Sequence, residues 1–352
     1  MKEDDTMSND PQAKFGRHTL GQGHPTFIIA EIGATHAGSV DQALKLIEVA
    51  ADLGAQAVKL QTVNPDYSYV HGTLSHQIFQ SLQLSLDEMI RMKKAAEAFG
   101  LILFSTPGDF PSLELVQKVD FAIMKMSSGL MTNKPLVEAA ARTGKPMIIS
   151  SGMAYLDEIA RSVRFARDAG AKEIAVLHCT ALYPCPDNRL NLRAIPHMIR
   201  ALGVPVGFSD HSPDELASPI AVVLGACAVE KHLALSHELA GPEKGTACDP
   251  AQFRAMVHAI RRAEQMRGDG IKAPALEEAH GRIVHRRTVI ACKPIPKGTA
   301  LSKDNISVMR GAEAHIGVTP ELFESLLGLK AARDIKSGEP IKPGLLTESG
   351  NG

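Results

Sequence analysis

Tryptophan is absent from this chain of 352 residues, and aromatic residues make up only 4% of it. Proteins that stack single-stranded nucleic acid on exposed rings need more aromatic side chains than this. An excess of charge of one sign is also missing, because 38 Lys and Arg oppose 39 Asp and Glu. The net charge of -1 gives no general attraction for nucleic acid or for an anionic membrane. We therefore expect neither of them as a partner.

Long apolar runs and regularly spaced cysteines are missing as well. The longest apolar stretch, around Ile220 to Val229, is shorter than the roughly 20 residues that cross a bilayer and is interpreted as buried core. The acidic start of the sequence has no secretory signal pattern. Five cysteines, an odd number without regular spacing, favour a reducing compartment and no disulfide framework or thiolate zinc site. These features predict a cytoplasmic protein.

Short β-branched runs alternate with longer amphipathic segments from Phe27 to about Arg267. Eight strands are predicted, over residues 27–32, 57–62, 101–106, 121–126, 146–151, 174–180, 204–210 and 227–233. Helices are predicted between them, including residues 40–53, 86–99, 155–169 and 191–202. In the first helix, Leu44, Ile47 and Ala51 have the spacing of an inward-facing stripe. Eight strand–helix units in about 250 residues predict a (β/α)₈ TIM barrel, with an open doubly wound sheet as the alternative.

The character of the sequence changes after this region. Gly268-Asp269-Gly270 and Pro274 indicate a linker, and short strands and turns are predicted beyond it. We expect four parts: a flexible lead-in over residues 1–22, the barrel over 23–270, a linker over 271–284 and a small β-rich domain over 285–352. The last part has few groups suited to catalysis, which favours a role in binding or assembly.

Polar or ionisable residues replace apolar ones at the carboxyl end of every predicted strand. In TIM-barrel enzymes, the active site is built from these strand ends and from the loops that follow them. The residues are Glu31; Lys59 and Gln61; Ser105 and Thr106; Lys125, Ser127 and Ser128; Ser150 and Ser151; His178 and Thr180; Ser209, Asp210 and His211; and Glu230, Lys231 and His232. Strands that reach solvent explain a few such residues, but eight strands in succession predict an active site.

Two of these residues, Lys59 and Lys125, are expected at neighbouring strand ends with Ser and Thr hydroxyls around them. The turn at Ser150–Met153 adds a glycine, where backbone N–H groups can approach a ligand. Ammonium groups, hydroxyls and free amides together predict a site for phosphate or carboxylate. An ion-paired lysine is the simpler explanation for either lysine taken alone.

His211 and His232 end the seventh and eighth predicted strands, which are adjacent in a barrel. Two neutral imidazoles suit a divalent metal, with Mn, Fe, Co and Zn all compatible. Two histidines leave the coordination shell open, which suits a Lewis acid that polarises a carbonyl group. A hydrogen-bonded pair of histidines without a metal is the alternative.

A series of motifs follows one order along the predicted barrel. They are Phe27–Gly33 with Gly38, Ala57–Thr62, Phe104–Pro107, Thr143–Pro146, Ser151–Met153, Leu177–Thr180 with Tyr183-Pro184, Gly207–His211 and Glu230–His232. This ordered set resembles the sialic acid synthase (N-acetylneuraminate synthase) family. Lys297-Gly298 and Arg310 resemble the antifreeze-like (SAF) domain that ends these enzymes. The resemblance implies a TIM barrel followed by a SAF domain.

The resemblance also implies an activity. The family condenses phosphoenolpyruvate with an N-acyl amino sugar, N-acetylmannosamine in the type case, and forms a nonulosonic acid and phosphate. The cofactor it implies is a divalent metal, Mn²⁺ or Mg²⁺ with Co²⁺ as a third option, which polarises the open-chain aldehyde. It implies a domain-swapped homodimer as well, in which Arg310 contacts the N-acyl group in the neighbouring subunit's site.

Site residues are carried over on the matching motifs. The implied catalytic residues are Glu31, Lys59, Lys125 and Glu230. The implied substrate-binding residues are Gln61, Thr106, Ser128, Ser150, Ser151, His178, Tyr183, Ser209, Glu243 and Arg310. The implied metal ligands are His211 and His232.

The sequence departs from the family pattern at several positions. Leu130 stands where the family has a glutamate that moves a proton or stabilises charge. Thr35 replaces an amide, Glu243 replaces an aspartate, and residues 62–86 are short and atypical. Two alternatives therefore stay open. One is condensation of phosphoenolpyruvate with another aldehyde or with a pseudaminic- or legionaminic-type sugar, and the other is a non-catalytic barrel that binds a metabolite.

Overall fold

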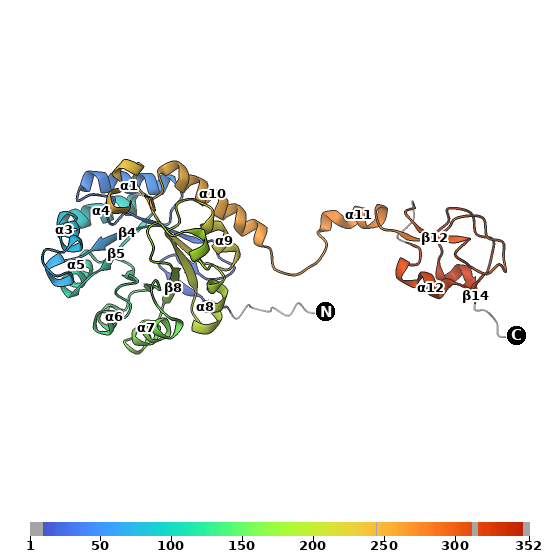
Figure 1. Cartoon of the computed structure of the whole chain (residues 1–352), viewed down its shortest axis with the longest axis horizontal. Helices are drawn as coiled ribbons and strands as arrows, with labels where there is room; N and C mark the ends of the chain where they lie inside the picture. The colour runs from blue at the N-terminus through green and yellow to red at the C-terminus, as the bar shows by residue number, and fades with distance from the viewer. Residues whose placement is uncertain (1–9, 244, 312–315, 348–352) are drawn as a thin grey trace. The chain divides into compact units, whose positions relative to one another are not determined.

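The computed structural model describes residues 10–243, 245–311 and 316–347. The chain divides into two compact units, Met1–Gly268 and Asp269–Gly352. Figure 1 shows the first unit with its helices outside the strands. Its eight parallel strands close into a barrel in the order β10-β3-β4-β5-β6-β7-β8-β9. The strands are β3 (Phe27–Glu31), β4 (Ala57–Thr62), β5 (Ile102–Pro107), β6 (Met124–Met126), β7 (Met147–Ser150), β8 (Ile174–Cys179), β9 (Val206–Asp210) and β10 (Ala228–His232). The predicted TIM barrel is confirmed, and every strand overlaps its predicted range.

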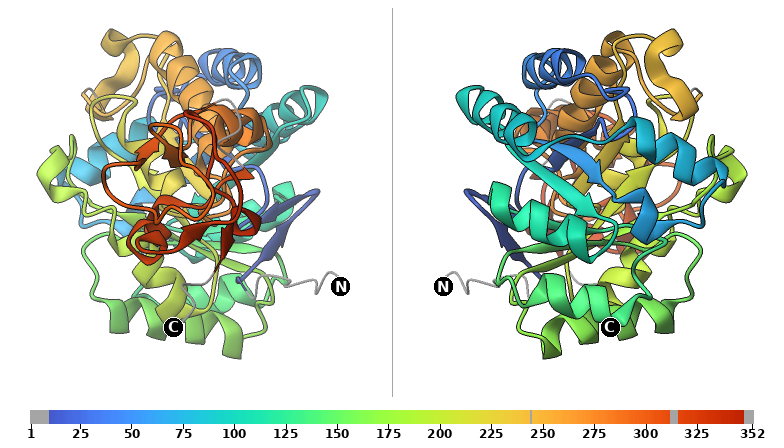
Figure 2. Two further views of the ribbon diagram at one scale, coloured as in Figure 1. Left: turned by 90° about the vertical axis from the view of Figure 1, so that its right-hand side faces the viewer. Right: turned by 90° about the vertical axis from the view of Figure 1, so that its left-hand side faces the viewer.

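Helices surround the barrel, as the views in Figure 2 show. They are α1 (Val40–Asp52), α2 (Pro65–Ser68), α3 (Leu74–Ser81), α4 (Leu86–Ala98), α5 (Phe110–Val119), α6 (Lys134–Ala141), α7 (Leu156–Asp168), α8 (Ala194–Leu202), α9 (Ala217–Val223) and α10 (Pro250–Arg267), with short 3₁₀ turns η1 (Asp187–Arg189) and η2 (His237–Glu243). Several begin at a side-chain cap: Ser85 and Glu88 form a capping box at α4, which satisfies backbone N–H groups that have no partner within the helix. None of the described helices is long and apolar enough to cross a membrane.

The buried face of α1 differs from the predicted stripe. The helix buries Ala43, Leu46, Ile47 and Ala50. Of the predicted stripe only Ile47 is buried, whereas Leu44 and Ala51 are half-buried at the edge of the contact. The small alanines let the helix approach the barrel closely. Because alanine is small, the part that Ala43 and Ala50 play in the buried face is not apparent from the spacing of large apolar side chains.

An antiparallel hairpin precedes the barrel, formed by β1 (Ala13–Phe15) and β2 (His18–Leu20), the dark blue strands of Figure 2. The backbone N–H of Lys14 donates to the carboxylate of Glu173, just before β8, over 2.6 Å. Arg17 donates to the carbonyl oxygen of Gly100, just before β5, over 2.7 Å. Because these partners precede barrel strands, the hairpin covers the amino end of the barrel.

This hairpin corrects the expectation of a flexible lead-in over residues 1–22. Phe15 and Leu20 are fully buried and belong to the barrel's hydrophobic core. Residues 10–22 are therefore part of the folded unit, while residues 1–9 of the predicted lead-in lie outside the described residues. Three-residue strands are too short to show a period-2 pattern, which explains why the sequence did not reveal them.

The second unit has its own small core. It contains η3 (Leu276–Glu278), α11 (Ala279–Val284), β11 (Thr288–Ala291), β12 (Ile306–Met309), η5 (Pro320–Leu322), α12 (Phe323–Leu326), β13 (Lys330–Ala331), η6 (Pro343–Leu345) and β14 (Leu346–Thr347). Strands β11 and β12 pair antiparallel, as do β13 and β14. Val289, Ile306 and Ile341 are buried together in a core of this unit. The unit is β-rich, as the turn pattern predicts.

Replacement of Phe15 tests whether the hairpin stabilises the barrel. Phe15→Ala should lower the free energy of unfolding by about 3–5 kcal/mol, because it leaves a cavity under the barrel strands. Phe99→Ala is the matched control, since this ring at the end of α4 is 52% exposed. Urea denaturation of both variants measures the difference, and equal losses would show that the hairpin is not part of the core.

Candidate functional site

A cavity of about 530 Å³ opens among the carboxyl ends of the barrel strands. Most of the predicted site residues line it: Lys59, Gln61, Thr106, Lys125, Ser128, Ser150, Tyr183, Ser209, His211, Glu230 and His232. They come from β4, β5, β6, β7, β9 and β10 or from the loops after these strands and after β8. The rim that the sequence singles out therefore surrounds one space.

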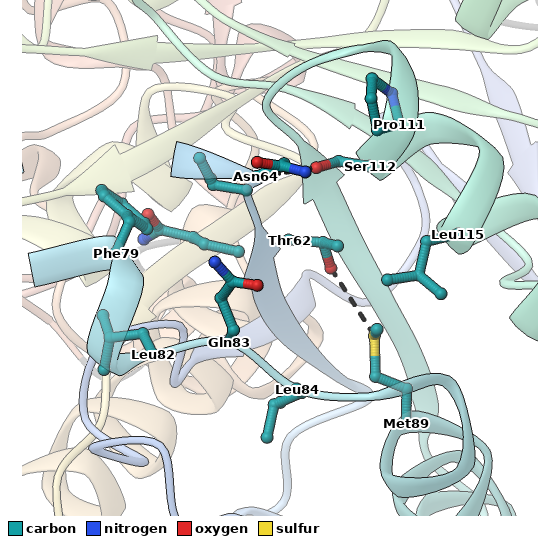
Figure 3. A pocket seen from close by; sticks show the side chains of 12 residues that line it. Thr62, Asn64, Phe79, Leu82, Gln83, Leu84, Met89, Pro111, Ser112 and Leu115 are labelled. Carbon is teal, nitrogen blue, oxygen red and sulfur yellow. Dashed lines mark hydrogen bonds between the residues drawn. The ribbon is translucent and has the colours of Figure 1, made fainter. Parts of the chain in front are cut away.

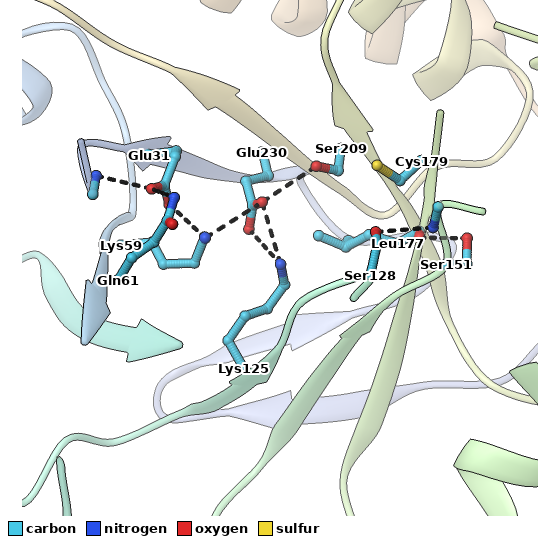
Figure 4. Close-up of polar contacts among 12 residues, drawn as sticks. Glu31, Lys59, Gln61, Lys125, Ser128, Ser151, Leu177, Cys179, Ser209 and Glu230 are labelled. Atoms are coloured by element: carbon cyan, nitrogen blue, oxygen red, sulfur yellow. Dashed lines mark hydrogen bonds and ion pairs between the residues drawn. The ribbon is translucent and has the colours of Figure 1, made fainter. Parts of the chain in front are cut away.

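Glu31 lies fully buried behind this cavity, at the end of β3 (Figure 4). Its Oε1 atom accepts hydrogen bonds from the backbone N–H of Gly33 (2.8 Å) and from Nε2 of Gln61 (2.9 Å). Its Oε2 atom lies 2.5 Å from the Lys59 ammonium. A side chain at Gly33 would overlap Glu31 and Gln61. Glycine at this position therefore permits the carboxylate to be held in this way.

Glu230 lies between the two buried lysines. Its carboxylate is 3.2 Å from Nζ of Lys125 and 3.7 Å from Nζ of Lys59, and it accepts a hydrogen bond from the Ser209 hydroxyl over 3.2 Å. Glu31, Lys59, Glu230 and Lys125 thus alternate in charge, as Figure 4 shows. We expected the two lysines at the ends of neighbouring strands. This was wrong, because β5 lies between β4 and β6. Glu230 on β10 bridges them across the barrel interior.

The pKa values of these groups follow from that arrangement. Burial lowers the pKa of Lys59, but the carboxylates of Glu230 and Glu31 outweigh burial and raise it to about 12. Burial and the neighbouring Lys59 hold the pKa of Lys125 below its ordinary value, although Glu230 opposes them. Burial raises the pKa of Glu230, but the two ammonium groups outweigh it and hold that pKa well below its usual range. A negative charge placed beside Lys125 would favour its charged form.

Hydroxyl groups complete the wall beside the lysines. Oγ1 of Thr106 and Oγ of Ser150 are buried and have no hydrogen-bond partner among the described residues. Buried hydroxyls without partners are unfavourable, so a ligand or water is expected to bond them. Ser128 accepts a hydrogen bond from the Gly152 N–H over 2.9 Å, which leaves its own proton to donate. We expected the backbone N–H groups of this turn to approach a ligand directly. The Gly152 N–H instead orients the hydroxyl of Ser128.

His211 and His232 lie at the side of the cavity formed by β9 and β10. Nδ1 of His211 is 2.9 Å from the carbonyl oxygen of Thr180, so this nitrogen carries the proton and Nε2 has the lone pair. Burial, reinforced by His232, lowers the pKa of His211 to about 3, which keeps the ring neutral. Nδ1 of His232 lies 2.9 Å from Oε2 of Glu243, and the two imidazole rings are 5.4 Å apart.

These donors fit a divalent metal. Both histidines line the cavity, and a hydrogen bond at Nδ1 fixes the His211 ring with Nε2 available, the usual arrangement of metal-ligating histidine. Nδ1 of His232 and Oε2 of Glu243 are close enough for an ion pair but have no hydrogen-bond partner among the described residues. Donor atoms of Glu31, His232 and Glu243 also lie within 4.8 Å of one another. Glu31 already pairs with Lys59, however, so we favour His211 and His232 as ligands. Glu243 then orients His232 from behind and does not line the cavity wall.

Besides Glu243, three predicted substrate-binding residues lie elsewhere. The Ser151 hydroxyl donates to the carbonyl oxygen of Leu177 over 2.8 Å. Nε2 of His178 lies 2.8 Å from the carbonyl oxygen of Leu190. Ser151 and His178 both line a separate cavity of about 510 Å³ beside α7 and α8. Arg310 is an exposed residue of the second unit. The barrel unit by itself therefore brings none of these three to the cavity of the lysines.

Other residues line the cavity without having been singled out. Ser68, Tyr69 and Phe79 come from the segment between β4 and α4, and Cys179 ends β8. Alternation along a strand could have identified Cys179, because consecutive residues face opposite sides and His178 faces away. Leu130 also lines the cavity. It is half-buried and adds an apolar side chain to the wall.

Comparisons with known proteins show the family of this chain. A family model described as the NeuB family matches residues 46–272, and one described as the SAF domain matches residues 286–347. An uncharacterised protein of Methanocaldococcus jannaschii is 36% identical over 93% of this chain and 96% of its own length. The N,N'-diacetyllegionaminic acid synthase of Campylobacter jejuni is 34% identical over 90% of this chain and 99% of its own.

Solved structures are similar as well, and one of them illustrates this. It is the N-acetylneuraminic acid (sialic acid) synthetase of Leptospira borgpetersenii in complex with citrate, with a TM-score of 0.74 and 29% identity. The match covers 77% of this chain and 95% of that one. The similarity therefore extends over most of both chains.

Replacement of Glu230 tests the charge network without reference to any ligand. Glu230→Gln should lower the free energy of unfolding by about 3–5 kcal/mol, because two buried ammonium groups then share one carboxylate. Folding lowers the pKa of Glu230. Its contribution to the free energy of unfolding is therefore complete above the unfolded pKa of about 4.3 and is lost as the pH falls further. The difference between wild type and variant should therefore be constant at neutral pH and shrink in acid.

Glu97→Gln is the matched control for this experiment. Glu97 pairs with Lys93 over 3.8 Å on the surface of α4, and its side chain is 59% exposed. Its loss should cost less than about 1 kcal/mol, since exposed pairs are screened by water. Urea denaturation between pH 3 and pH 8 measures both variants. Equal and small effects would contradict a buried network that depends on Glu230.

Proposed function

We propose that this chain, which belongs to the NeuB family and has a SAF domain, is a nonulosonic acid synthase. In the proposed reaction it condenses phosphoenolpyruvate with an N-acyl amino sugar and forms a nonulosonic acid and phosphate. The observation that carries the proposal is one cavity with two buried lysines and unpartnered hydroxyls on one side and two oriented histidines on the other. This combination suits a substrate with two anionic groups and an acceptor with a carbonyl.

The lysine side of the cavity would bind phosphoenolpyruvate. Lys59 and Lys125 provide positive charge, and Thr106, Ser128 and Ser150 provide hydroxyl donors, for the phosphate and carboxylate groups. Charge-assisted hydrogen bonds of this kind are stronger than neutral ones, above all in a buried site. Binding would also raise the pKa of Lys125, which is held low in the free protein.

His211 and His232 would hold the divalent cation, with Glu243 fixing the orientation of His232. Imidazole ligands suit Mn²⁺ or Co²⁺ better than Mg²⁺, so Mn²⁺ is our first choice. When bound, the cation would supply Lewis acidity to the carbonyl group of the open-chain acceptor. Tyr183, whose ring lies 4.1 Å from the His211 ring, would contact the acceptor on this side.

In the proposed reaction, the enol carbon of phosphoenolpyruvate attacks the aldehyde carbon of the acceptor, water adds at C2, and phosphate leaves by C–O cleavage. The chain would hold the two substrates in attack geometry, which removes much of the entropic barrier. Glu230 has a lowered pKa and is a weak base, so we assign it to holding the lysines charged and in place. Leu130 transfers no proton, and we assign the fully buried Glu31 to holding Lys59 charged and in place.

The acceptor is proposed only as a class. The two named relatives form legionaminic acid and sialic acid, so their names do not select one N-acyl sugar. Leu130 favours a second candidate, condensation with a different sugar or aldehyde, because an apolar side chain occupies part of the wall. We further propose that the active form is a domain-swapped homodimer in which Arg310 reaches the neighbouring cavity.

Phosphate release tests the proposed activity. The protein should release phosphate from phosphoenolpyruvate with Mn²⁺ and one member of a panel of N-acyl hexosamines, and a chelator should stop the release. His211→Ala should reduce turnover by at least about 100-fold, since loss of a ligand costs no less than loss of its outer partner. His197→Ala, an exposed histidine of α8, is the matched control and should retain activity.

Two results would contradict the proposal. Turnover with several non-sugar aldehydes and none with N-acyl hexosamines would support the second candidate. Phosphoenolpyruvate binding without phosphate release under any acceptor would support a non-catalytic barrel.

Replacement of Arg310 tests the dimer. Arg310→Ala should raise the KM for the acceptor about tenfold and leave kcat nearly unchanged, because the proposed contact lies away from the new bond. Arg333→Ala in the same unit is the control, since Arg333 forms an exposed pair with Glu339. Wild-type kinetics with every acceptor would refute a role for Arg310 in the neighbouring site.

A further inference from the structure

The segment between β4 and α4 contains a second cluster of groups that can bind a metal. Asp66 lies in α2, His76 lies in α3, and His71 lies in the connection between them. One donor atom from each lies within 4.8 Å of the others. We propose that Asp66, His71 and His76 form a divalent-metal site, separate from the histidine pair of the barrel cavity and suited to a borderline cation such as Zn²⁺.

The distances in the cluster already approach those of a coordination shell. Nε2 of His76 lies 2.9 Å from Oδ1 of Asp66, and Nε2 of His71 lies 3.7 Å from the same oxygen. Ligands of a tetrahedral Zn²⁺ at about 2.0–2.1 Å are about 3.3 Å apart from one another. Small side-chain rotations therefore suffice to bring the three donors around one ion.

The backbone of the cluster is fixed independently of any metal. The Asn64 side chain accepts a hydrogen bond from the Asp66 N–H at the start of α2 (3.1 Å), and the Thr73 hydroxyl accepts one from the His76 N–H at the start of α3 (3.3 Å). Gly72 has a φ of +83°, a conformation that favours glycine, and it turns the chain between His71 and Thr73. These contacts order the start of each helix, so an ion would have to order only the packing between α2 and α3.

The choice of ligands indicates the class of ion. Two imidazoles and one carboxylate suit Zn²⁺ or Co²⁺, whereas Mg²⁺ and Ca²⁺ prefer oxygen ligands. His76 is buried at 6% exposure, while the side chains of His71 and Asp66 are 76% and 60% exposed. An ion can therefore enter from solvent, and water can complete the fourth position. A hydrogen-bonded aspartate with two histidines and no ion is the competing explanation.

The position of the cluster gives it a consequence for the cavity. The segment that the ion would tie together places Ser68, Tyr69 and Phe79 on the wall of the barrel cavity. The rings of Tyr69 and Phe79 stack with centroids 5.4 Å apart. A bound ion would join α2 to α3 directly and thereby restrain this part of the wall.

The packing below the segment leaves room for movement. A cavity of about 100 Å³ separates the end of α3 from β4 and from the helices beyond it, lined by Phe79, Leu82, Thr62 and Met89 among others (Figure 3). Since the segment is not closely packed against the barrel there, a tie between its two helices would add stability that the core does not supply. Metal binding should therefore reduce local opening of residues 65–81.

Zinc binding to the full chain tests the proposal. The background for this experiment is the His211→Ala/His232→Ala variant, which lacks the histidine pair of the barrel cavity. Once a chelator has removed its metal, equilibrium dialysis should show one Zn²⁺ bound per chain. Addition of His71→Ala should weaken that binding by at least about tenfold, as expected for loss of a ligand. Asp66→Asn, which keeps the shape but removes the charge, should have a similar effect. His258→Ala, an exposed histidine of α10, should leave the affinity unchanged.

Two further measurements distinguish a metal site from a hydrogen-bonded cluster. Zn²⁺ should slow hydrogen exchange of residues 65–81 in the background chain and not in the chain with His71→Ala. Co²⁺ should give the visible absorption of a tetrahedral complex only when His71 is present. Because His71 is exposed, its replacement should leave the unfolding curve of the metal-free protein unchanged. Equal zinc affinity with and without His71, or no zinc binding to the background chain, would overturn the proposal.

Discussion

The structure of the site depends on the alternation of charge among Glu31, Lys59, Glu230 and Lys125. Two ammonium groups can be buried in a barrel only if opposite charges compensate for the water they lose. Glu31 and Glu230 provide that compensation from β3 and β10, which are neighbours across the closure of the barrel. The hydroxyls, the histidines and the cavity are arranged around this network. An anion that enters meets positive charge already held in position, so little reorganisation is needed when it binds.

Much of the barrel could be predicted from the sequence, because buried parallel strands are continuous apolar runs with turn residues on either side. Strand polarity then identifies the rim that surrounds the cavity, since the carboxyl ends of all strands lie together. The hairpin over the amino end could not be predicted in this way. Its strands are three residues long, and the contacts that hold it involve residues far away in the sequence, such as Glu173.

Within the rim, the misplacement of Ser151 and His178 has one physical cause. Polar residues were selected by their position near a strand end and not by the side of the strand that they face. In a strand, consecutive side chains face opposite sides. Glu230 and His232 therefore line the cavity, while Lys231 is buried on the other side and donates to the carbonyl oxygen of Ser212. His178 and Cys179 differ in the same way, and a strict use of the alternation would have separated them.

The helical excursion between β4 and α4 has a consequence for how such proteins diversify. Its two short helices begin at caps that lie within the excursion itself, Asn64 and Thr73. Hydrogen bonds from Asn64 and Ser68 to Asp109, the N-cap of α5, join the segment to the barrel, so these contacts must be kept when the rest of it changes. The wall of the cavity that this segment forms can then change while the network of Glu31 and Glu230 is kept. Recombination between related genes at the two ends of this segment would be a direct route to new specificity.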